Sequence, residues 1–133
     1  MKQATYIDVQ FKGNGLVPEQ LAKQLNLPLT VLMSSGAIAP IGRYKGQESP
    51  YGIGVYQIKF NYDDLIQLID YLYEQRHELN SCFVDTIIFD IPGTETLQNQ
   101  FVFNAMYLNK MKHLKASIVW QSSLINAAES VFG

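Results

Sequence analysis

Five segments of the chain show the hydrophobic pattern that is typical of β-strands. Near the start, Ile7, Val9 and Phe11 alternate with polar residues, so that one side of a strand would be apolar and the other polar. Further along, Tyr56 and Ile58 alternate with polar residues in the same way. We expect strands at residues 4–11, 29–33, 53–60, 84–91 and 116–121.

Three short helices are predicted from apolar residues spaced three and four positions apart. One begins at Pro18, which suits the first turn of a helix, and one occupies residues 105–113 behind the cap residue Asn104. A third would begin after Ser122 or Ser123, near the end of the chain. In the helix at 105–113, the residues expected to point inward are Leu108, Met111 and Leu114.

A longer helix is predicted from the cap residue Asn61 to about Leu79. Asp63 and Asp64 fall in its first turn, where carboxylates stabilise the positive end of a helix. Its apolar stripe consists of Leu65, Leu68, Ile69, Leu72 and Leu79. We expect this stripe to be buried against a sheet that contains Ile7, Val9, Ile58, Ile88 and Val119, or their alternating neighbours.

The order of these elements predicts an α+β fold. Strands and helices mix without strict alternation, which favours a single mainly antiparallel sheet with two to three helices packed on one face. The chain shows no linker or internal repeat, so residues 1–133 are expected to form one globular domain.

A glycine-rich segment, residues 34–54, interrupts the regular pattern. It contains five glycines and two prolines, and a loop of this length inside a compact domain is usually functional or mobile. A short irregular strand is expected at residues 41–44. Arg43, Tyr44 and Tyr51 are candidate contact residues, because Tyr and Arg are favoured at interface hot spots. The alternatives are a flexible connector, or a pocket under the loop that serves a small enzyme or a ligand-binding domain.

Composition excludes several classes of protein. The single cysteine, Cys82, rules out an intramolecular disulfide and argues against a thiolate zinc site. The start of the chain has no apolar signal-peptide region, and no apolar run is long enough to cross a bilayer. A net charge of −2 argues against general nucleic-acid binding. We therefore expect a cytoplasmic protein with no cofactor, no metal, no nucleic-acid partner and no membrane partner.

No set of residues with catalytic spacing is evident. His77 and His113 lie far apart in the sequence without a companion at ligand spacing, and no Cys–His spacing supports Cys82 as a nucleophile. The segment Ser34-Ser35-Gly36 lacks the flanking glycines of a nucleophile elbow. These observations predict that the protein is not an enzyme.

Charge is concentrated in residues 61–100, which hold eight of the twelve carboxylates and one basic residue, Arg76. On a continuous helix, six polar residues would fall within about 100° of arc, opposite the apolar stripe. These residues are Asp63, Gln67, Asp70, Glu74, His77 and Glu78. Arg76 would lie nearer the apolar side, so no cation on this helix would neutralise the stripe. The stripe is either a solvated helix face or a surface that binds a basic partner.

In its small size, its cytosolic chemistry, its acidic helix face and its lack of a catalytic set, the chain resembles the immunity proteins of bacterial contact-dependent growth inhibition. That resemblance implies a one-domain protein that binds and neutralises a cognate toxin, often a basic nuclease. The chain is also similar to a family of uncharacterised small bacterial domains. The similarity lies in segments 15–21 and 42–46, the strand to Phe60 and the helix with Leu72 and Tyr73. This second similarity implies an α+β fold.

The first functional hypothesis is therefore a toxin-neutralising protein that binds a cognate toxin domain through the acidic stripe, with Arg43, Tyr44 and Tyr51 as additional contacts. A small enzyme or ligand-binding domain is the alternative, and a homodimer or larger homo-oligomer is a third.

Overall fold

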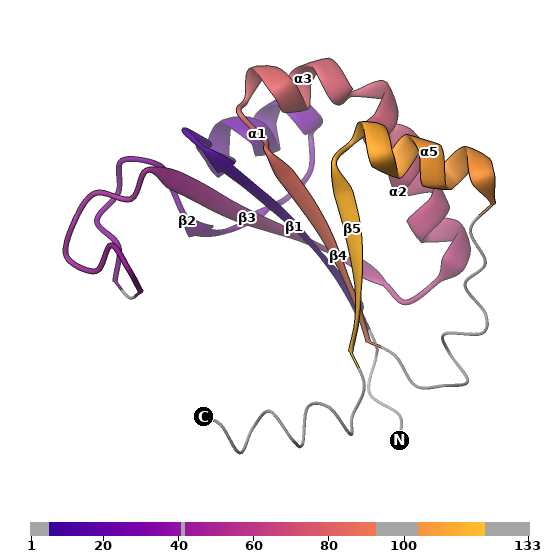
Figure 1. Cartoon of the computed structure of the whole chain (residues 1–133), viewed down its shortest axis with the longest axis horizontal. Coiled ribbons are helices and arrows are strands. Elements are labelled where there is room, and N and C mark those ends of the chain that lie inside the picture. The colour runs from indigo at the N-terminus through magenta and orange to yellow at the C-terminus, as the bar shows by residue number, and fades with distance from the viewer. Residues whose placement is uncertain (1–5, 41, 93–103, 122–133) are drawn as a thin grey trace.

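The computed structural model describes residues 6–40, 42–92 and 104–121, and Figure 1 shows their arrangement. The first half of the chain forms β1 (Tyr6–Asn14), α1 (Pro18–Leu25), β2 (Thr30–Met33) and β3 (Tyr51–Lys59). The second half forms α2 (Tyr62–Glu74), α3 (Arg76–Ser81), β4 (Thr86–Pro92), α5 (Ala105–His113) and β5 (Ala116–Gln121). None of the described helices is long and apolar enough to span a bilayer.

The five described strands form one sheet in the order β2-β3-β1-β4-β5. β1 lies at the centre and pairs antiparallel with β3 and with β4, and β2 pairs antiparallel with β3. β4 and β5 are parallel, which requires a crossover between them, and α5 forms part of that crossover. The prediction of an α+β fold with a mainly antiparallel sheet is confirmed.

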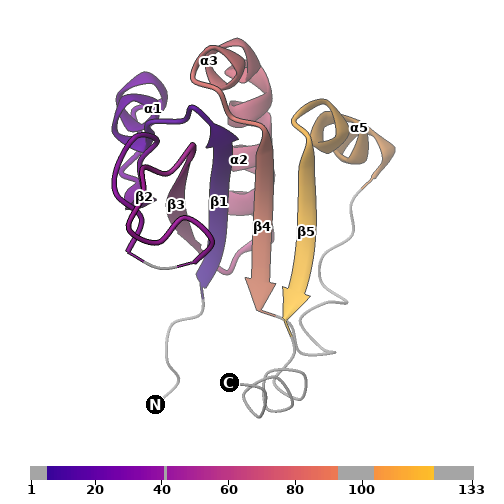
Figure 2. The same ribbon diagram turned by 60° about the vertical axis from the view of Figure 1, so that its left-hand side comes forward.

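The described helices lie on one side of this sheet (Figures 1 and 2). Their apolar residues form a single core with the alternate residues of β1 and β4. The predicted stripe of α2 is part of it, because Leu65, Ile69 and Leu72 are fully buried and Leu68 is 7% exposed. From the sheet, the fully buried residues are Ile7, Val9, Phe11, Ile87, Phe89 and Ile91.

Two of the predicted sheet contacts belong to the opposite face. Ile87 and Phe89 point into the core, so Ile88 between them points away, and Val119 of β5 is 46% exposed. Ile118, the neighbour of Val119, is the residue that packs against the core. An apolar run does not by itself reveal which alternate residues face inward, because that choice is set by strand register.

The predicted continuous helix to Leu79 is wrong, because the helix ends at Glu74 and a separate helix begins at Arg76. Between them Gln75 has φ −95° and ψ 18°, outside the usual α-helical values. The guanidinium of Arg76 donates a hydrogen bond of 2.8 Å to the carbonyl of Tyr73, which satisfies an acceptor at the end of α2. The break raises the number of described helices to four, and α3 reaches toward α1.

Other local predictions meet mixed outcomes. Asn61 and Asn104 both cap helices, with side-chain oxygens accepting from the N–H groups of Asp64 and Tyr107. In α5, Met111 is buried, whereas Leu108 is 54% exposed and does not point inward. Residues 42–44 do not form a strand, and Leu114, just past α5, is buried as predicted. Ile41 and the predicted tail helix lie outside the described residues.

Candidate functional site

The break at Gln75 divides the predicted acidic stripe between two helices. One side of α2 carries four of the stripe's residues, spaced three and four positions apart: Asp63, Gln67, Asp70 and Glu74. The other two, His77 and Glu78, belong to α3. Asp63, Gln67, Glu74 and His77 are exposed, while Asp70 and Glu78 are half-buried. The predicted stripe is therefore an acidic row of four residues on α2, followed by two residues, His77 and Glu78, on a separate helix.

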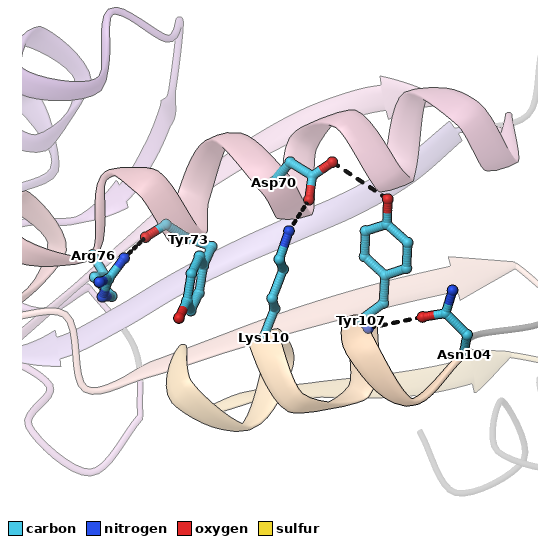
Figure 3. A network of polar contacts seen from close by, with 6 residues as sticks. All are labelled: Asp70, Tyr73, Arg76, Asn104, Tyr107 and Lys110. Carbon is cyan, nitrogen blue, oxygen red and sulfur yellow. Dashed lines mark hydrogen bonds and ion pairs between the residues drawn. The ribbon is translucent and has the colours of Figure 1, made fainter.

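Asp70 is paired within the domain, which corrects the expectation that no cation neutralises the stripe. The ammonium of Lys110, on α5, lies 2.5 Å from Asp70 Oδ1, and the hydroxyl of Tyr107 lies 3.4 Å from Oδ2 (Figure 3). The same ammonium lies 5.5 Å from the ring centre of Tyr73 and 5.3 Å from that of Tyr107. The expectation considered cations on the same helix, and the partner comes from forty residues further along the chain.

These contacts shift the protonation equilibria of both α5 residues. The hydrogen bond to Asp70 raises the pKa of Lys110, because it stabilises the charged ammonium. The pKa of Tyr107 is also raised, mainly because the hydroxyl is desolvated and secondly because the negative charge of Asp70 lies nearby. Asp70 thus fastens α2 to α5 at neutral pH, and its role within the fold makes it a poor candidate for a free binding group.

Among the described residues, the other carboxylates of these helices have no such partner. No ion pair joins Asp63, Asp64, Glu74 or Glu78 to a cation in the part of the chain that the structure describes. Asp63 and Asp64 stand in the first turn of α2 and Glu78 in the first turn of α3, where a negative charge is favourable, but Glu74 is the last residue of α2, where it is not. An external cation would therefore be attracted to this surface.

A groove flanks the acidic row of α2, between that helix and the edge of the sheet, and Gln67 belongs to both. It has a volume of about 430 Å³. Its helix wall contains Asp64, Gln67, Leu68 and Tyr71, and the hydroxyl of Tyr71 donates to the carbonyl of Leu25 at 2.5 Å. Its remaining lining residues are Leu27, Tyr56, Gln57, Ile58 and Lys59. No pattern in the sequence indicates this groove, because it depends on how far β2 extends along β3.

Because β3 begins at Tyr51, the loop within the glycine-rich segment ends at residue 50. Hydrogen bonds within its own backbone hold this loop in shape. Gly36 N–H donates to Ser49 at 2.8 Å, Ala39 N–H to Gln47 at 2.9 Å, and Gly46 N–H to the carbonyl of Ala39 at 2.9 Å. At its start, Ser34 donates a 2.7 Å hydrogen bond to Glu19, which lowers the pKa of that carboxyl. The loop protrudes from one end of the sheet (Figure 1).

The loop brings together the three predicted contact residues and one that was not predicted. The Arg43 guanidinium lies 5.5 Å from the ring centre of Tyr44, whose ring meets that of Tyr51 edge to face at 6.1 Å. Lys12 of β1 lies 5.7 Å from the Tyr51 ring. Lys12 enters this cluster through the pairing of β1 with β3, so no local sequence signal points to it.

The pocket beside this loop offers little reactive chemistry. It encloses about 280 Å³ and is lined by Lys12, Gly13, Asn14, Tyr44, Pro50, Tyr51, Asp85 and Thr86. Its carboxylate, Asp85, accepts a 2.8 Å hydrogen bond from the backbone N–H of Asn14, and its ammonium lies over Tyr51. These polar groups are engaged with the protein itself, which suits a contact surface better than a proton-transfer site.

The remaining reactive side chains lie apart. His113 is exposed, with Nδ1 2.8 Å from the carbonyl oxygen of Asn109, and its ring meets that of Tyr73. Cys82 is half-buried, and burial raises the pKa of its thiol. Among the described residues, no group of three or more His, Cys, Asp or Glu side chains is arranged to hold a metal ion.

The chain matches no protein-family model, no curated protein and no solved structure. The function proposed below therefore rests on the sequence, geometry and charge of this chain.

Proposed function

We propose that this chain is a protein-binding domain that captures a basic partner through the carboxylates of α2 and of Glu78 on α3 that form no ion pair with a described residue. The observation that supports this most is the contrast within the acidic row. Asp70 is neutralised by Lys110, whereas Glu74, one turn further along, and Glu78 form no ion pair with a cation among the described residues. A partner surface rich in Lys and Arg would relieve this like-charge repulsion and associate faster because of the complementary field.

The partner that best fits this surface is a toxin domain with nuclease activity, which binding would neutralise. A nuclease must attract phosphates and therefore carries a dense patch of Lys and Arg. A rigid acidic helix face is complementary to such a patch and would block it. The resemblance of the sequence to immunity proteins of contact-dependent growth inhibition supports the same proposal.

The test begins with affinity purification of the partner from the native host and its identification by mass spectrometry. Glu74→Lys should weaken binding at least tenfold and reduce its dependence on salt, because an attractive charge becomes repulsive. Glu48→Lys is the matched control, since Glu48 is also exposed but lies in the loop. Equal affinities of wild type and Glu74→Lys, measured by calorimetry, would contradict the proposal.

The loop cluster is a second candidate interface, because Arg43, Tyr44, Tyr51 and Lys12 converge there from separate segments. If this cluster is the interface, Tyr44→Ala should abolish binding of the same partner while Glu74→Lys leaves it intact. That result would move the interface from the helices to the loop, and would leave the carboxylates of α2 as a solvated face.

A further inference from the structure

The outer edge of β3 is paired along only part of its length. β2 pairs with residues Ile53, Gly54 and Val55, and the pairing ends there. Residues 56–59 continue as strand and pair with β1 on their inner side. On the outer side, no described residue pairs with them. In a strand, the N–H and C=O groups of alternate residues point outward, so this edge presents a short row of groups ready for pairing.

The sequence before β2 explains why the pairing stops. Thr30 pairs with Val55, so an antiparallel continuation would place Pro28 opposite Gln57. Proline has no N–H to donate, and it is confined to sheet edges and strand starts for that reason. Asn26, two residues earlier, has a left-handed conformation with φ 53° that turns the chain out of α1. Leu27 then lines the groove, so the edge of β3 stays open.

The open edge forms one wall of the groove described above, and α2 forms the other. On α2, Asp64, Gln67, Leu68 and Tyr71 recur at helical spacing and share one side of the helix. The groove therefore combines a strand edge, which supplies backbone hydrogen bonds, with a helix face, which supplies side-chain contacts. Both are requirements for recognition of an extended peptide by strand addition.

We propose that an extended segment of the partner protein adds to β3 along residues 56–59 and lies in the groove against α2. The proposal deepens the proposed function and rests on it in one respect, that α2 meets the partner. It places the contact on the Asp64–Tyr71 side of the helix and assigns the segment a conformation, whereas the carboxylates of Glu74 and Glu78 supply charge attraction nearby.

The two faces of the added strand would meet different chemistry. Side chains on the core face would lie against Tyr56, Ile58 and Tyr71, with Asp64 at the start of α2. That face suits one basic and one apolar residue two positions apart, since alternate side chains of a strand are about 6.7 Å apart on one face. Lys59 alternates with Ile58 and so belongs to the other face, where it suits an acidic or uncharged polar residue.

The first test uses a phage-displayed library of random decapeptides selected on the full chain. The enriched peptides should share a basic and an apolar residue two positions apart and contain no proline between them. Binding of a synthetic enriched peptide is then measured by fluorescence polarisation. Gln67→Trp, which fills the groove, should weaken that binding at least tenfold. Gln24→Trp, an exposed glutamine on α1 outside the groove, should change it less than twofold.

The second test separates backbone pairing from side-chain contact. Copies of the peptide carry N-methyl groups on one or the other set of alternate amides, which removes donors and leaves the side chains unchanged. One set should abolish binding and the other should not, because only alternate N–H groups face β3. In the bound protein, amide hydrogen exchange should slow within residues 56–59.

Failure of this proposal is distinguishable from failure of the proposed function. Strand addition would be overturned if no peptides were enriched, or if the peptide bound Gln67→Trp as tightly as wild type. It would also be overturned if both methylation patterns were tolerated equally, or if the protein formed a dimer through this edge. Glu74→Lys would still test the acidic surface with the purified partner. If peptides bind the groove but Glu74→Lys leaves partner binding unchanged, strand addition stands and the role of the acidic row fails.

Discussion

The acidic side of α2 and the glycine-rich loop are both candidate interfaces, but they are held in place by different means. α2 is positioned from beneath, by four apolar residues that are buried in the core. The loop is positioned from within, by backbone hydrogen bonds between its own residues, and Ile38 in it is 62% exposed. A helix face can therefore change its outward residues without changing shape, whereas the loop depends on backbone conformations that few residues tolerate.

The largest expected contrast is in the response to removal of an apolar side chain. Leu72→Ala should destabilise the protein by about 2–5 kcal/mol, because it leaves a cavity under α2. Ile38→Ala in the loop should change the free energy of unfolding by less than about 0.5 kcal/mol, since its side chain is mostly in solvent. Urea unfolding of both variants checks this. Similar losses in the two would mean that the loop packs more tightly than its exposure indicates.

A smaller contrast is expected between Gly52, near the start of β3, and Gly42, in the middle of the loop. A Cβ at Gly52 would lie 2.1 Å from the carbonyl oxygen of Leu16, so Gly52→Ala should destabilise the protein by about 2–3 kcal/mol. A Cβ at Gly42 would meet no atom within 4 Å, and only its φ of +86° opposes a side chain. Gly42→Ala should therefore lower the free energy of unfolding by about 1–2 kcal/mol. If Gly42→Ala were the more damaging variant in thermal unfolding, the loop would be the more constrained region.

The smallest expected effect concerns the ion pair that joins α2 to α5. Lys110→Met should lower the melting temperature by about 2 °C at pH 7, because Asp70 loses its cation. Lys112→Met removes the same charge from an exposed position on the same helix and serves as the control. Calorimetry between pH 7 and pH 12 shows whether the ion pair is responsible.

The pH dependence of that difference has a definite sign. The folded pKa of Lys110 is raised above the ordinary lysine value of 10.5, so its charge stabilises the fold fully below that value. The stabilisation is lost as the pH rises through the raised pKa. The difference in melting temperature between wild type and Lys110→Met should therefore shrink above about pH 10.5. A constant difference up to pH 12 would show that Lys110 acts through packing on Tyr73 and Tyr107.

Local features of the fold were predictable because their causes are local. Asn61 and Asn104 cap helices through bonds to the N–H groups three residues ahead, and such bonds need no other part of the chain. The apolar stripe of α2 is equally local, because helical spacing brings Leu65, Ile69 and Leu72 to one side whatever lies opposite.

Features that depend on distant segments were not predictable from one sequence. Register decides that Ile87 and Phe89 face the core and that Ile88 does not, and a shift by one residue would reverse that choice. The break at Gln75 is a second example, since nothing in the helical pattern marks it and α3 turns there toward α1.

The candidate site divides in the same way. The sequence by itself determined that α2 carries carboxylates opposite its buried stripe, because charge and helical spacing are both written in consecutive residues. Tertiary structure alone decided that Lys110 neutralises Asp70, that Lys12 joins the loop tyrosines, and that the edge of β3 opens beside α2. The first two features join residues about forty positions apart, and the third depends on where the pairing of β2 with β3 ends. Packing of the whole core sets all three.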